Sequence, residues 1–103
     1  MKKIGEIIRE RREQKGFLLR QVAAKLDIDN AILSKIERGE RKPTRDHILK
    51  LADILELNTE ELLIQFLSDK IAYEIADEEV ATQTLRLAEK KVNYLKLSKN
   101  GKV

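Results

Sequence analysis

Apolar residues recur at intervals of three and four positions through most of this chain, the spacing that places them on one face of an α-helix. The first stretch begins at Ile4 and ends at Lys15, where Gly16 can stop a helix. A second helix of little more than two turns is predicted at residues 18–26, with its inner face formed by Leu19, Val22, Ala23 and Leu26. A third is predicted to start after Asp29 as N-cap and to reach Arg38.

The same periodicity continues after Pro43, the only proline. Thr44 is placed to cap a fourth helix, and Asn58 with Glu61 three residues later forms a capping-box pattern that opens a fifth. Their inner faces are predicted to contain Ile48, Leu51, Ala52 and Leu55, and then Leu62, Leu63, Phe66 and Leu67. The pattern predicts an all-α fold, with a five-helix domain at residues 1–67.

Residues 68–98 form a predicted helical extension, and residues 99–103 a flexible tail. We expect a short helix carrying Ile71, Ala72 and Ile75, followed by a longer one over residues 77–97. The longer helix contains a heptad seam two repeats long, formed by Ala81, Leu85, Ala88, Val92 and Leu95. This seam either folds back on its own domain or meets a second copy of the chain, and we favour the homodimer because a complete small domain gives a terminal helix no other reason to bury a face.

Composition removes several classes of function. A chain of 103 residues fits one domain with an appendage. It has no cysteine and a single histidine, His47, so a clustered transition-metal site is excluded and no cofactor is expected. No apolar run approaches the roughly 18 residues that span a bilayer, so we expect a cytoplasmic protein without a membrane partner.

Charge is distributed unevenly along the chain. Residues 1–45 contain 13 Lys and Arg against 7 Asp and Glu, a net charge of +6. Residues 46–89 carry a net charge of −8, and residues 90–103 one of +5. A basic first half is expected of a protein that binds a polyanion, because each phosphate contact releases condensed counterions.

Only about three residues separate the second and third predicted helices, which is the geometry of a helix-turn-helix. The run GFLLRQVAAKLDIDNAILSKIERGERKP resembles the Cro/repressor-type helix-turn-helix family, the xenobiotic-response-element class of bacterial regulators. The matching positions are Gly16, Ala23, Leu26, Ile28, Ser34, Ile36, Glu37, Arg38, Gly39 and Pro43. The resemblance extends from residue 4 to about residue 66 and implies a lambda-repressor-like domain that binds double-stranded DNA.

The resemblance also implies roles for individual residues. The base-reading side chains would be Asn30, Ala31, Ser34 and Lys35. The phosphate-binding side chains would be Arg38, Arg41, Lys42 and Arg45, with Arg20 as a further candidate. Arg12 would form a structural ion pair with Glu37 that orients the third helix.

Four positions depart from the family pattern. Leu18 stands where relatives have a capping Ser or Thr, and the missing cap is expected to cost ~1 kcal/mol. Leu19 replaces a phosphate-binding Gln, a contact that Arg20 would have to supply. Asp27 and Glu56 stand where glycine is usual, and aspartate tolerates the left-handed conformation better than most residues.

The leading hypothesis is a dimeric, sequence-specific regulator of transcription acting on a near-palindromic operator, such as a restriction-modification controller or a phage-type repressor. The alternative is an antitoxin-like protein that binds a protein partner through its C-terminal helices and regulates its own synthesis. An enzyme is the weakest hypothesis, because His47 has no partner nucleophile in the pattern. No small-molecule effector is evident, since the residues after 67 are too few to enclose a sizeable pocket.

Overall fold

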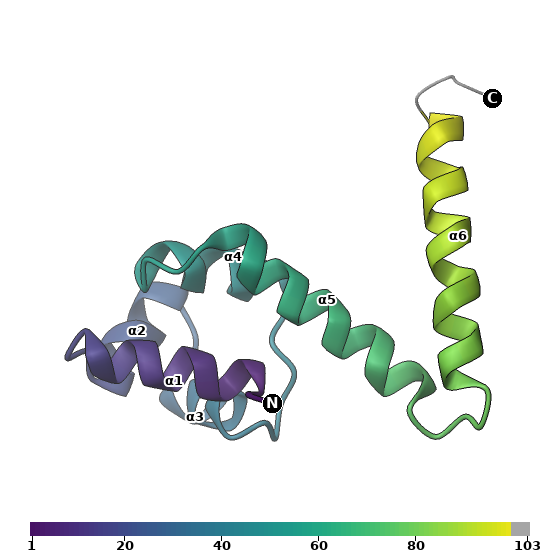
Figure 1. The fold of residues 1–103 in the computed structure, drawn as a ribbon. Coiled ribbons are helices and arrows are strands. Elements are labelled where there is room, and N and C mark those ends of the chain that lie inside the picture. The colour runs from purple at the N-terminus through teal and green to yellow at the C-terminus, as the bar shows by residue number, and fades with distance from the viewer. Residues whose placement is uncertain (100–103) are drawn as a thin grey trace. The chain divides into compact units, whose positions relative to one another are not determined.

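The computed structural model describes residues 1–99, and the regular structure of that part is entirely helical (Figure 1). The six helices are α1 (Ile4–Gln14), α2 (Leu19–Leu26), α3 (Asn30–Glu37), α4 (Arg45–Ile54), α5 (Thr59–Ile75) and α6 (Ala81–Lys99). They belong to two compact units, Met1–Asp69 and a second that begins at Lys70. The expected all-α class is confirmed. Residues 100–103 of the predicted tail lie outside the described residues.

The first unit is built around α3, which packs against both α1 and α2, while α4 packs against α2. The apolar faces predicted from the sequence meet in one core, whose fully covered side chains include Ile8, Val22, Leu33, Ile36, Ile48, Leu51 and Leu55. One expected member is wrong: Leu67 is 39% exposed. It lies near the end of the first unit, beyond Phe66, the last buried side chain of α5.

The helix starts are satisfied locally. Thr44 Oγ1 accepts a hydrogen bond from the backbone N–H of His47 at 3.1 Å, and His47 Nδ1 accepts one from the N–H of Thr44 at 3.3 Å. Asn58 Oδ1 accepts one from the N–H of Glu61 at 2.9 Å. Both predicted caps are therefore confirmed, whereas Asp29 stands at the N-cap of α3 without a side-chain capping bond.

The departures at Leu18 and Asp27 have visible consequences. Leu18 occupies the N-cap of α2 and supplies no capping oxygen, as expected. Gln21 provides half of a capping box instead, because its Oε1 accepts a hydrogen bond from the N–H of Leu18 at 2.8 Å. Asp27 and Glu56 both adopt the left-handed conformation, with φ of 57° and 52°, which places them where glycine would be unstrained.

The boundaries after residue 67 differ from the prediction. The expected short helix at residues 71–75 is the end of α5, which continues from Thr59 without a break. No glycine or proline interrupts residues 68–75, and the Ser68 hydroxyl bonds back to the carbonyl of Gln65 at 2.9 Å within the helix. The last helix begins at Ala81 rather than at residue 77, because residues 76–80 form turns. The acidic side chains of these turns lie just before the N-terminus of α6, the positive end of the helix dipole.

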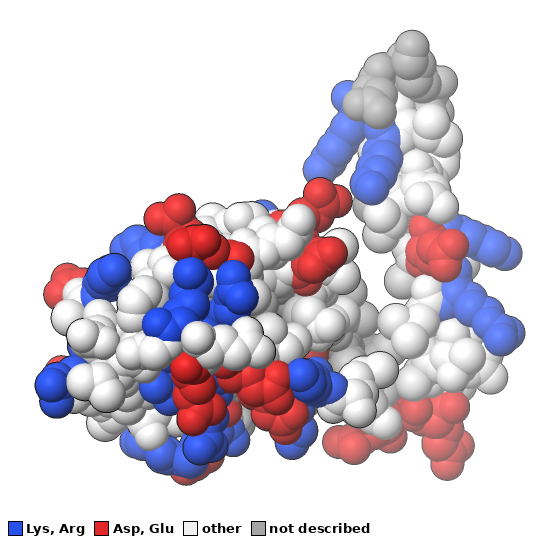
Figure 2. Space-filling view, turned by 60° about the vertical axis from the view of Figure 1, so that its left-hand side comes forward, with Lys and Arg blue, Asp and Glu red and all other residues white. Residues whose placement is uncertain are grey.

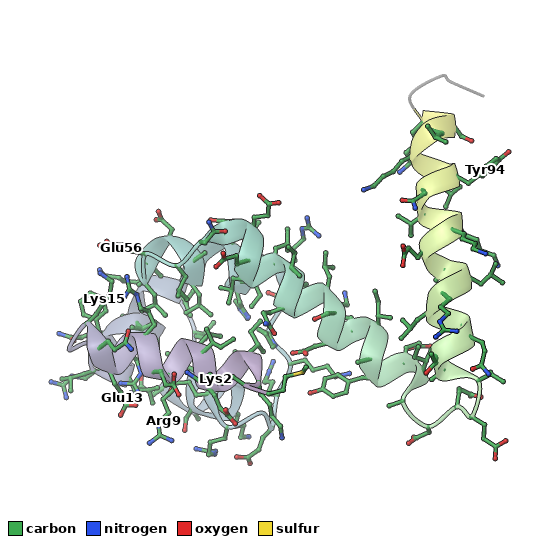
Figure 3. All side chains as sticks on the ribbon, viewed as in Figure 1. Lys2, Arg9, Glu13, Lys15, Glu56 and Tyr94 are labelled. Atoms are coloured by element: carbon green, nitrogen blue, oxygen red, sulfur yellow. The ribbon has the colours of Figure 1, made fainter. Side chains whose placement is uncertain are left out.

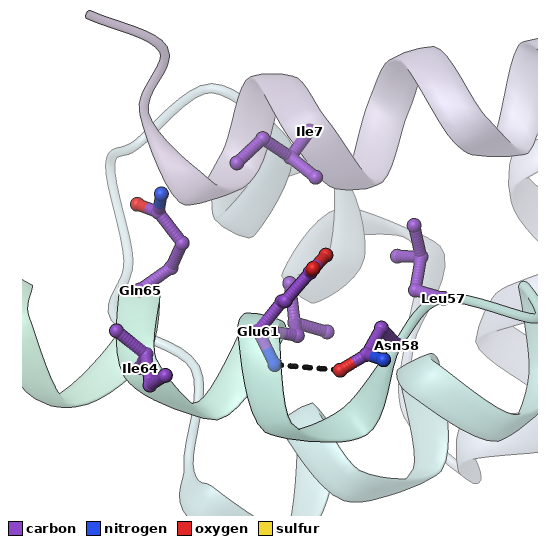
Figure 4. A pocket seen from close by; sticks show the side chains of 7 residues that line it. Ile7, Leu57, Asn58, Glu61, Ile64 and Gln65 are labelled. Atoms are coloured by element: carbon purple, nitrogen blue, oxygen red, sulfur yellow. Dashed lines mark hydrogen bonds between the residues drawn. The ribbon is translucent and has the colours of Figure 1, made fainter.

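An open groove lies between α1 and the start of α5 (Figure 4). Its lining residues are Ile7, Leu57, Asn58, Glu61, Leu62, Ile64 and Gln65. The hydrogen bond from the Glu61 N–H to Asn58 Oδ1 caps the N-terminal end of α5 there. Ile7 is half-buried because the groove leaves one side of it open.

The other end of α1 is tied to the end of α4. Arg11 Nε donates to the carbonyl of Leu55 at 2.8 Å, which satisfies a backbone acceptor that the helix itself leaves unpaired. Lys15 Nζ lies 2.9 Å from Glu56 Oε1, and Figure 3 shows these two side chains next to each other. The hydrogen bond from Lys15 and the attraction of its charge lower the pKa of the Glu56 carboxyl.

Gly5 allows α1 to approach α3 closely. A Cβ atom at this position would lie 2.5 Å from the carbonyl oxygens of both Ile36 and Glu37, a distance at which the backbone would have to shift. Glycine inside a helix normally costs up to about 1 kcal/mol relative to alanine. The close contact between the two helices therefore explains why alanine, the better helix former, is absent here.

We predict that Gly5→Ala lowers the stability of the protein, although the same change in an open helix would raise it. The expected loss is about 1–3 kcal/mol, because two backbones must separate to admit one methyl group. Thermal or urea unfolding followed by circular dichroism measures the change. Gln14→Ala, at an exposed position of the same helix, is the control and should leave stability unchanged within about 0.5 kcal/mol. Equal stability of Gly5→Ala and the natural protein would contradict the close approach.

Candidate nucleic-acid interface

The turn between α2 and α3 is closed by its own backbone. Asp27 N–H bonds to the carbonyl of Ala24 at 3.1 Å, and Ile28 N–H bonds to the carbonyl of Ala23 at 3.1 Å. These two bonds form a Schellman arrangement around the left-handed Asp27. Ile28 packs against the core and completes the arrangement with an apolar contact. The angle between the two helices is consequently fixed by the chain between them.

A buried ion pair holds α3 against α1. Arg12 Nε lies 2.8 Å from Glu37 Oε2, and Arg12 Nη2 lies 3.0 Å from Glu37 Oε1. The side chains are only 13% and 5% exposed, so both charges are largely removed from water. Arg12 Nη1 also donates to the carbonyl of Phe17 at 2.9 Å.

This pairing keeps the guanidinium charged. The hydrogen bonds that Arg12 donates to Glu37 raise the pKa of Arg12, against the opposing effect of burial. A bidentate geometry restricts rotation more than a single contact would, because two parallel bonds fix the plane of both groups. Glu37 is the last residue of α3, so the pair fixes the C-terminal end of the helix.

The four residues expected to read bases lie together on α3. Leu33, Ile36 and Glu37 face inward, whereas Ala31 and Lys35, four positions apart, lie on the opposite side of the helix and Asn30 is its first residue. These three side chains are exposed, whereas Ser34 is partly covered and its hydroxyl bonds to the guanidinium of Arg38. Three of the four are therefore open to an incoming duplex, and the fourth is engaged within the protein.

The expected phosphate-binding residues come from the start of α2, from the loop after α3 and from the start of α4. Arg20 is exposed in the first turn of α2, while Arg38, Arg41 and Lys42 lie between α3 and α4, and Arg45 opens α4. All five are exposed. Figure 2 shows that cationic side chains on the first unit are interspersed with anionic ones rather than forming an unbroken patch. One of those anions, Glu40, pairs with Arg38, a contact that the sequence analysis did not anticipate.

The predicted seam of α6 is accessible to solvent. Leu85, Val92 and Leu95 are exposed, as is Ala88, and Ala81 is partly covered. A second set of exposed apolar residues, Val80, Leu87 and Tyr94, also repeats every seven positions. The sequence carried this second signal, and the heptad analysis missed it because it followed one seam only.

The described part of the chain offers neither a metal site nor a membrane-spanning helix. Residues 1–99 contain no group of three or more His, Cys, Asp or Glu side chains that could hold a metal ion. Among the same residues, no helix is both long and apolar enough to cross a membrane.

Comparison with known proteins gives a consistent result. A family model described as "Helix-turn-helix" matches residues 8–62. The HTH-type transcriptional regulator ImmR of Bacillus subtilis (strain 168) is 37% identical over 60 residues, which cover 58% of this chain and 47% of ImmR. SlrR of the same organism is 38% identical over 60 residues, covering 57% of this chain and 40% of SlrR. The chain thus spans less than half the length of these two relatives.

Two further matches concern the domain and its fold. YazB of Bacillus subtilis (strain 168), named as an uncharacterised HTH-type transcriptional regulator, is 40% identical over 58 residues, covering 56% of this chain and 84% of YazB. A chain of the solved SinR protein/SinI protein complex aligns with a TM-score of 0.54 and 24% identity, covering 94% of this chain and 98% of that one. The lambda-repressor-like helix-turn-helix fold expected from the sequence is confirmed.

We predict that Glu37→Ala destabilises the protein by about 3 kcal/mol, because it leaves the largely buried guanidinium of Arg12 without its counter-charge. Chemical denaturation of this variant, of Arg12→Ala and of the double variant forms a cycle that isolates the pairwise energy. Glu13→Ala removes a carboxylate from the exposed Arg9–Glu13 pair and should change stability by less than about 0.5 kcal/mol. Strictly additive losses in the cycle would show that the pair does not hold α3.

Proposed function

The chain belongs to the HTH_3 family of helix-turn-helix transcriptional regulators, and from this premise we propose that it binds double-stranded DNA sequence-specifically as a homodimer. One observation carries the proposal: the inner side of α3 is fixed in the core by apolar contacts and by the ion pair to α1, while its outer side is exposed. A helix held in this way can enter a major groove without losing its place in the fold.

In the proposed complex, the outer side of α3 faces the base edges. Asn30 pairs with the N6 and N7 edge of adenine, Lys35 donates to guanine O6 or N7, and Ala31 contacts a thymine methyl group. Ser34 joins them once its hydroxyl is released from Arg38. This assignment is supported by the exposure of Asn30, Ala31 and Lys35.

The surrounding cations would contact the phosphate backbone and set the register of the protein on the duplex. Arg41 lies in the loop between α3 and α4, Arg45 opens α4, and Arg20 lies at the start of α2. Among residues 1–99, no carboxylate lies within ion-pairing distance of these three arginines, so their charges are available to phosphate.

A second copy of the chain would double the site. We assign residues 1–67 to DNA binding and residues 68–98 to dimerisation through Ala81, Leu85, Ala88, Val92 and Leu95, in place of a seam that folds back on its own domain. The proposal is supported by the heptad spacing and the exposure of Leu85, Val92 and Leu95. Two recognition helices about 34 Å apart would then require a near-palindromic operator.

The proposed setting is the bacterial cytoplasm, where a regulator of this size acts as a restriction-modification controller or a phage-type repressor. The exposed residues of α6 also support a second candidate, in which a different protein occupies the seam and the chain acts as an antitoxin-like partner. Co-purification of a second protein in fixed proportion would favour that candidate over the homodimer.

We predict that duplexes selected by the protein from a random pool contain a palindrome, and that two variants then separate base reading from phosphate binding. Lys35→Ala should weaken binding to the selected site by about 1–3 kcal/mol and relax the base preference at one position of each half-site. Arg41→Ala should weaken selected and random duplexes alike and reduce the slope of log K against log salt by about 1. Fluorescence anisotropy at several salt concentrations measures both effects. Identical behaviour of the two variants on both duplexes would contradict the role of Lys35.

We predict that Leu85→Lys, in the seam, converts the dimer to a monomer, because two lysines would face each other across the interface. Leu87→Lys is the matched control, since both leucines lie exposed on α6, at 46% and 53%, and only Leu85 belongs to the seam. Sedimentation equilibrium of both variants gives the result. A dimer that survives Leu85→Lys and is lost in Leu87→Lys would move the interface to the set formed by Val80, Leu87 and Tyr94.

A further inference from the structure

The end of α3 is held in a fixed conformation by its backbone. Gly39 adopts φ of 77° and its N–H bonds to the carbonyl of Ile36 at 3.1 Å. The N–H of the next residue, Glu40, bonds to the carbonyl of Lys35 at 2.8 Å. These are the two bonds of a Schellman motif, and they fix the backbone from which the Glu40 side chain projects.

Arg38 lies within reach of that side chain. Its Nε donates to the carboxylate of Glu40, and its Nη1 donates to the hydroxyl of Ser34. Both partners are within four residues of Arg38, and the Schellman motif holds Glu40 on the side of the helix end where Arg38 lies. The fixed backbone keeps the two side chains within reach of each other, but both are about half exposed, so the pair loses side-chain entropy as other exposed pairs do.

Glu40 is unusual in its surroundings. Between Asn30 and Arg45 the chain has five cations and two glutamates, and the other glutamate, Glu37, is buried in its ion pair with Arg12. The acids just outside this range are Asp29 and Asp46, and Asp46 pairs with Lys50. Glu40 is thus the single exposed carboxylate of the α3–loop segment, and it is bonded to a cation that would contact phosphate.

We propose that Glu40 competes with DNA phosphate for Arg38, so that its carboxylate limits the affinity of the protein for any duplex. The proposal rests on the proposed function, because it names a further residue that sets the strength of DNA binding. In the free protein the carboxylate holds Arg38, and a phosphate must displace it to reach the guanidinium.

The competition has a functional consequence. Non-specific binding to DNA is supplied almost entirely by phosphate contacts, so a carboxylate that withholds one guanidinium weakens it directly. Specific binding adds base contacts made by Asn30 and Lys35, which do not depend on Arg38. Because phosphate contacts are made in both kinds of complex, Glu40 lowers the affinity for selected and random duplexes by a similar factor and leaves the preference between them to Asn30 and Lys35.

The test is Glu40→Gln, which keeps the shape of the side chain and removes its charge. Its affinity for a random-sequence duplex at low salt should rise about three- to fivefold, the effect expected of an exposed pair. Glu13→Gln is the matched control, because Arg9–Glu13 is an exposed pair with side chains 58% and 56% accessible, close to the 51% and 55% of Arg38 and Glu40 (Figure 3). It changes the net charge equally and should alter the affinity less than about twofold.

The Arg38→Ala background separates competition from simple repulsion between Glu40 and phosphate. If Glu40 acts through Arg38, adding Glu40→Gln to Arg38→Ala should change the affinity less than about twofold. An equal gain with and without Arg38 would overturn the proposal, and so would a gain no larger than that of Glu13→Gln.

A measurement without DNA distinguishes failure of this proposal from failure of the proposed function. In ¹⁵N NMR spectra of the free protein, the Nε–H resonance of Arg38 should move in Glu40→Gln and stay in place in Glu13→Gln. A resonance that stays in place in both variants would overturn the inference alone. If the resonance moves but neither the natural protein nor any variant binds a duplex, the proposed function fails and the competition fails with it.

Discussion

Two charged side chains buried between α1 and α3 determine which side of α3 the first unit exposes to solvent. Arg12 and Glu37 would each be costly to bury alone, and only their bidentate contact makes the arrangement tolerable. Because Glu37 is the last residue of α3, satisfying this pair sets the rotation of the helix about its own axis. Gly5 acts in the same place, since its missing side chain lets α1 reach the carbonyls at the end of α3. The outer side of α3 is what these constraints leave exposed.

Features governed by neighbours in the sequence were predictable. The inner faces of the first five helices follow from the spacing of apolar residues, and the caps at Thr44 and Asn58 follow from a side chain three residues away from its partner. The boundaries after residue 67 were predicted less well. A capping pattern indicates where a helix starts. Residues 68–75, however, contain no glycine or proline that would end α5. The number of helices after residue 67 therefore depends on where the turn at residues 76–80 forms.

In the candidate site, too, features set by nearby residues were predictable, and those set by distant residues were not. The positions of Ala31 and Lys35 on the outer side of α3 follow from helical geometry once the inner face is known. The role of Gly5 could not be predicted, because it depends on carbonyls more than thirty positions away in the chain. The contact between Glu40 and Arg38 is local in sequence, yet it requires the left-handed turn at Gly39 to be recognised as a Schellman motif. An acidic residue within a basic loop was the only signal, and by itself it indicates no more than a solvated charge.

On the proposed function, the shortness of α3 explains why a second copy of the chain is needed. Its eight residues extend about 12 Å along the helix axis, which is close to the rise of four base pairs of DNA. One such helix distinguishes too few base pairs to select a site among the roughly one million or more that a genome offers. The left-handed Asp27 ends α2 just before α3, and the left-handed Gly39 ends α3 itself, so α3 is not extended at either end. On the proposed function, specificity has to come from a repeated half-site, so the exposed seam of α6 and the fixed outer side of α3 are two parts of one requirement.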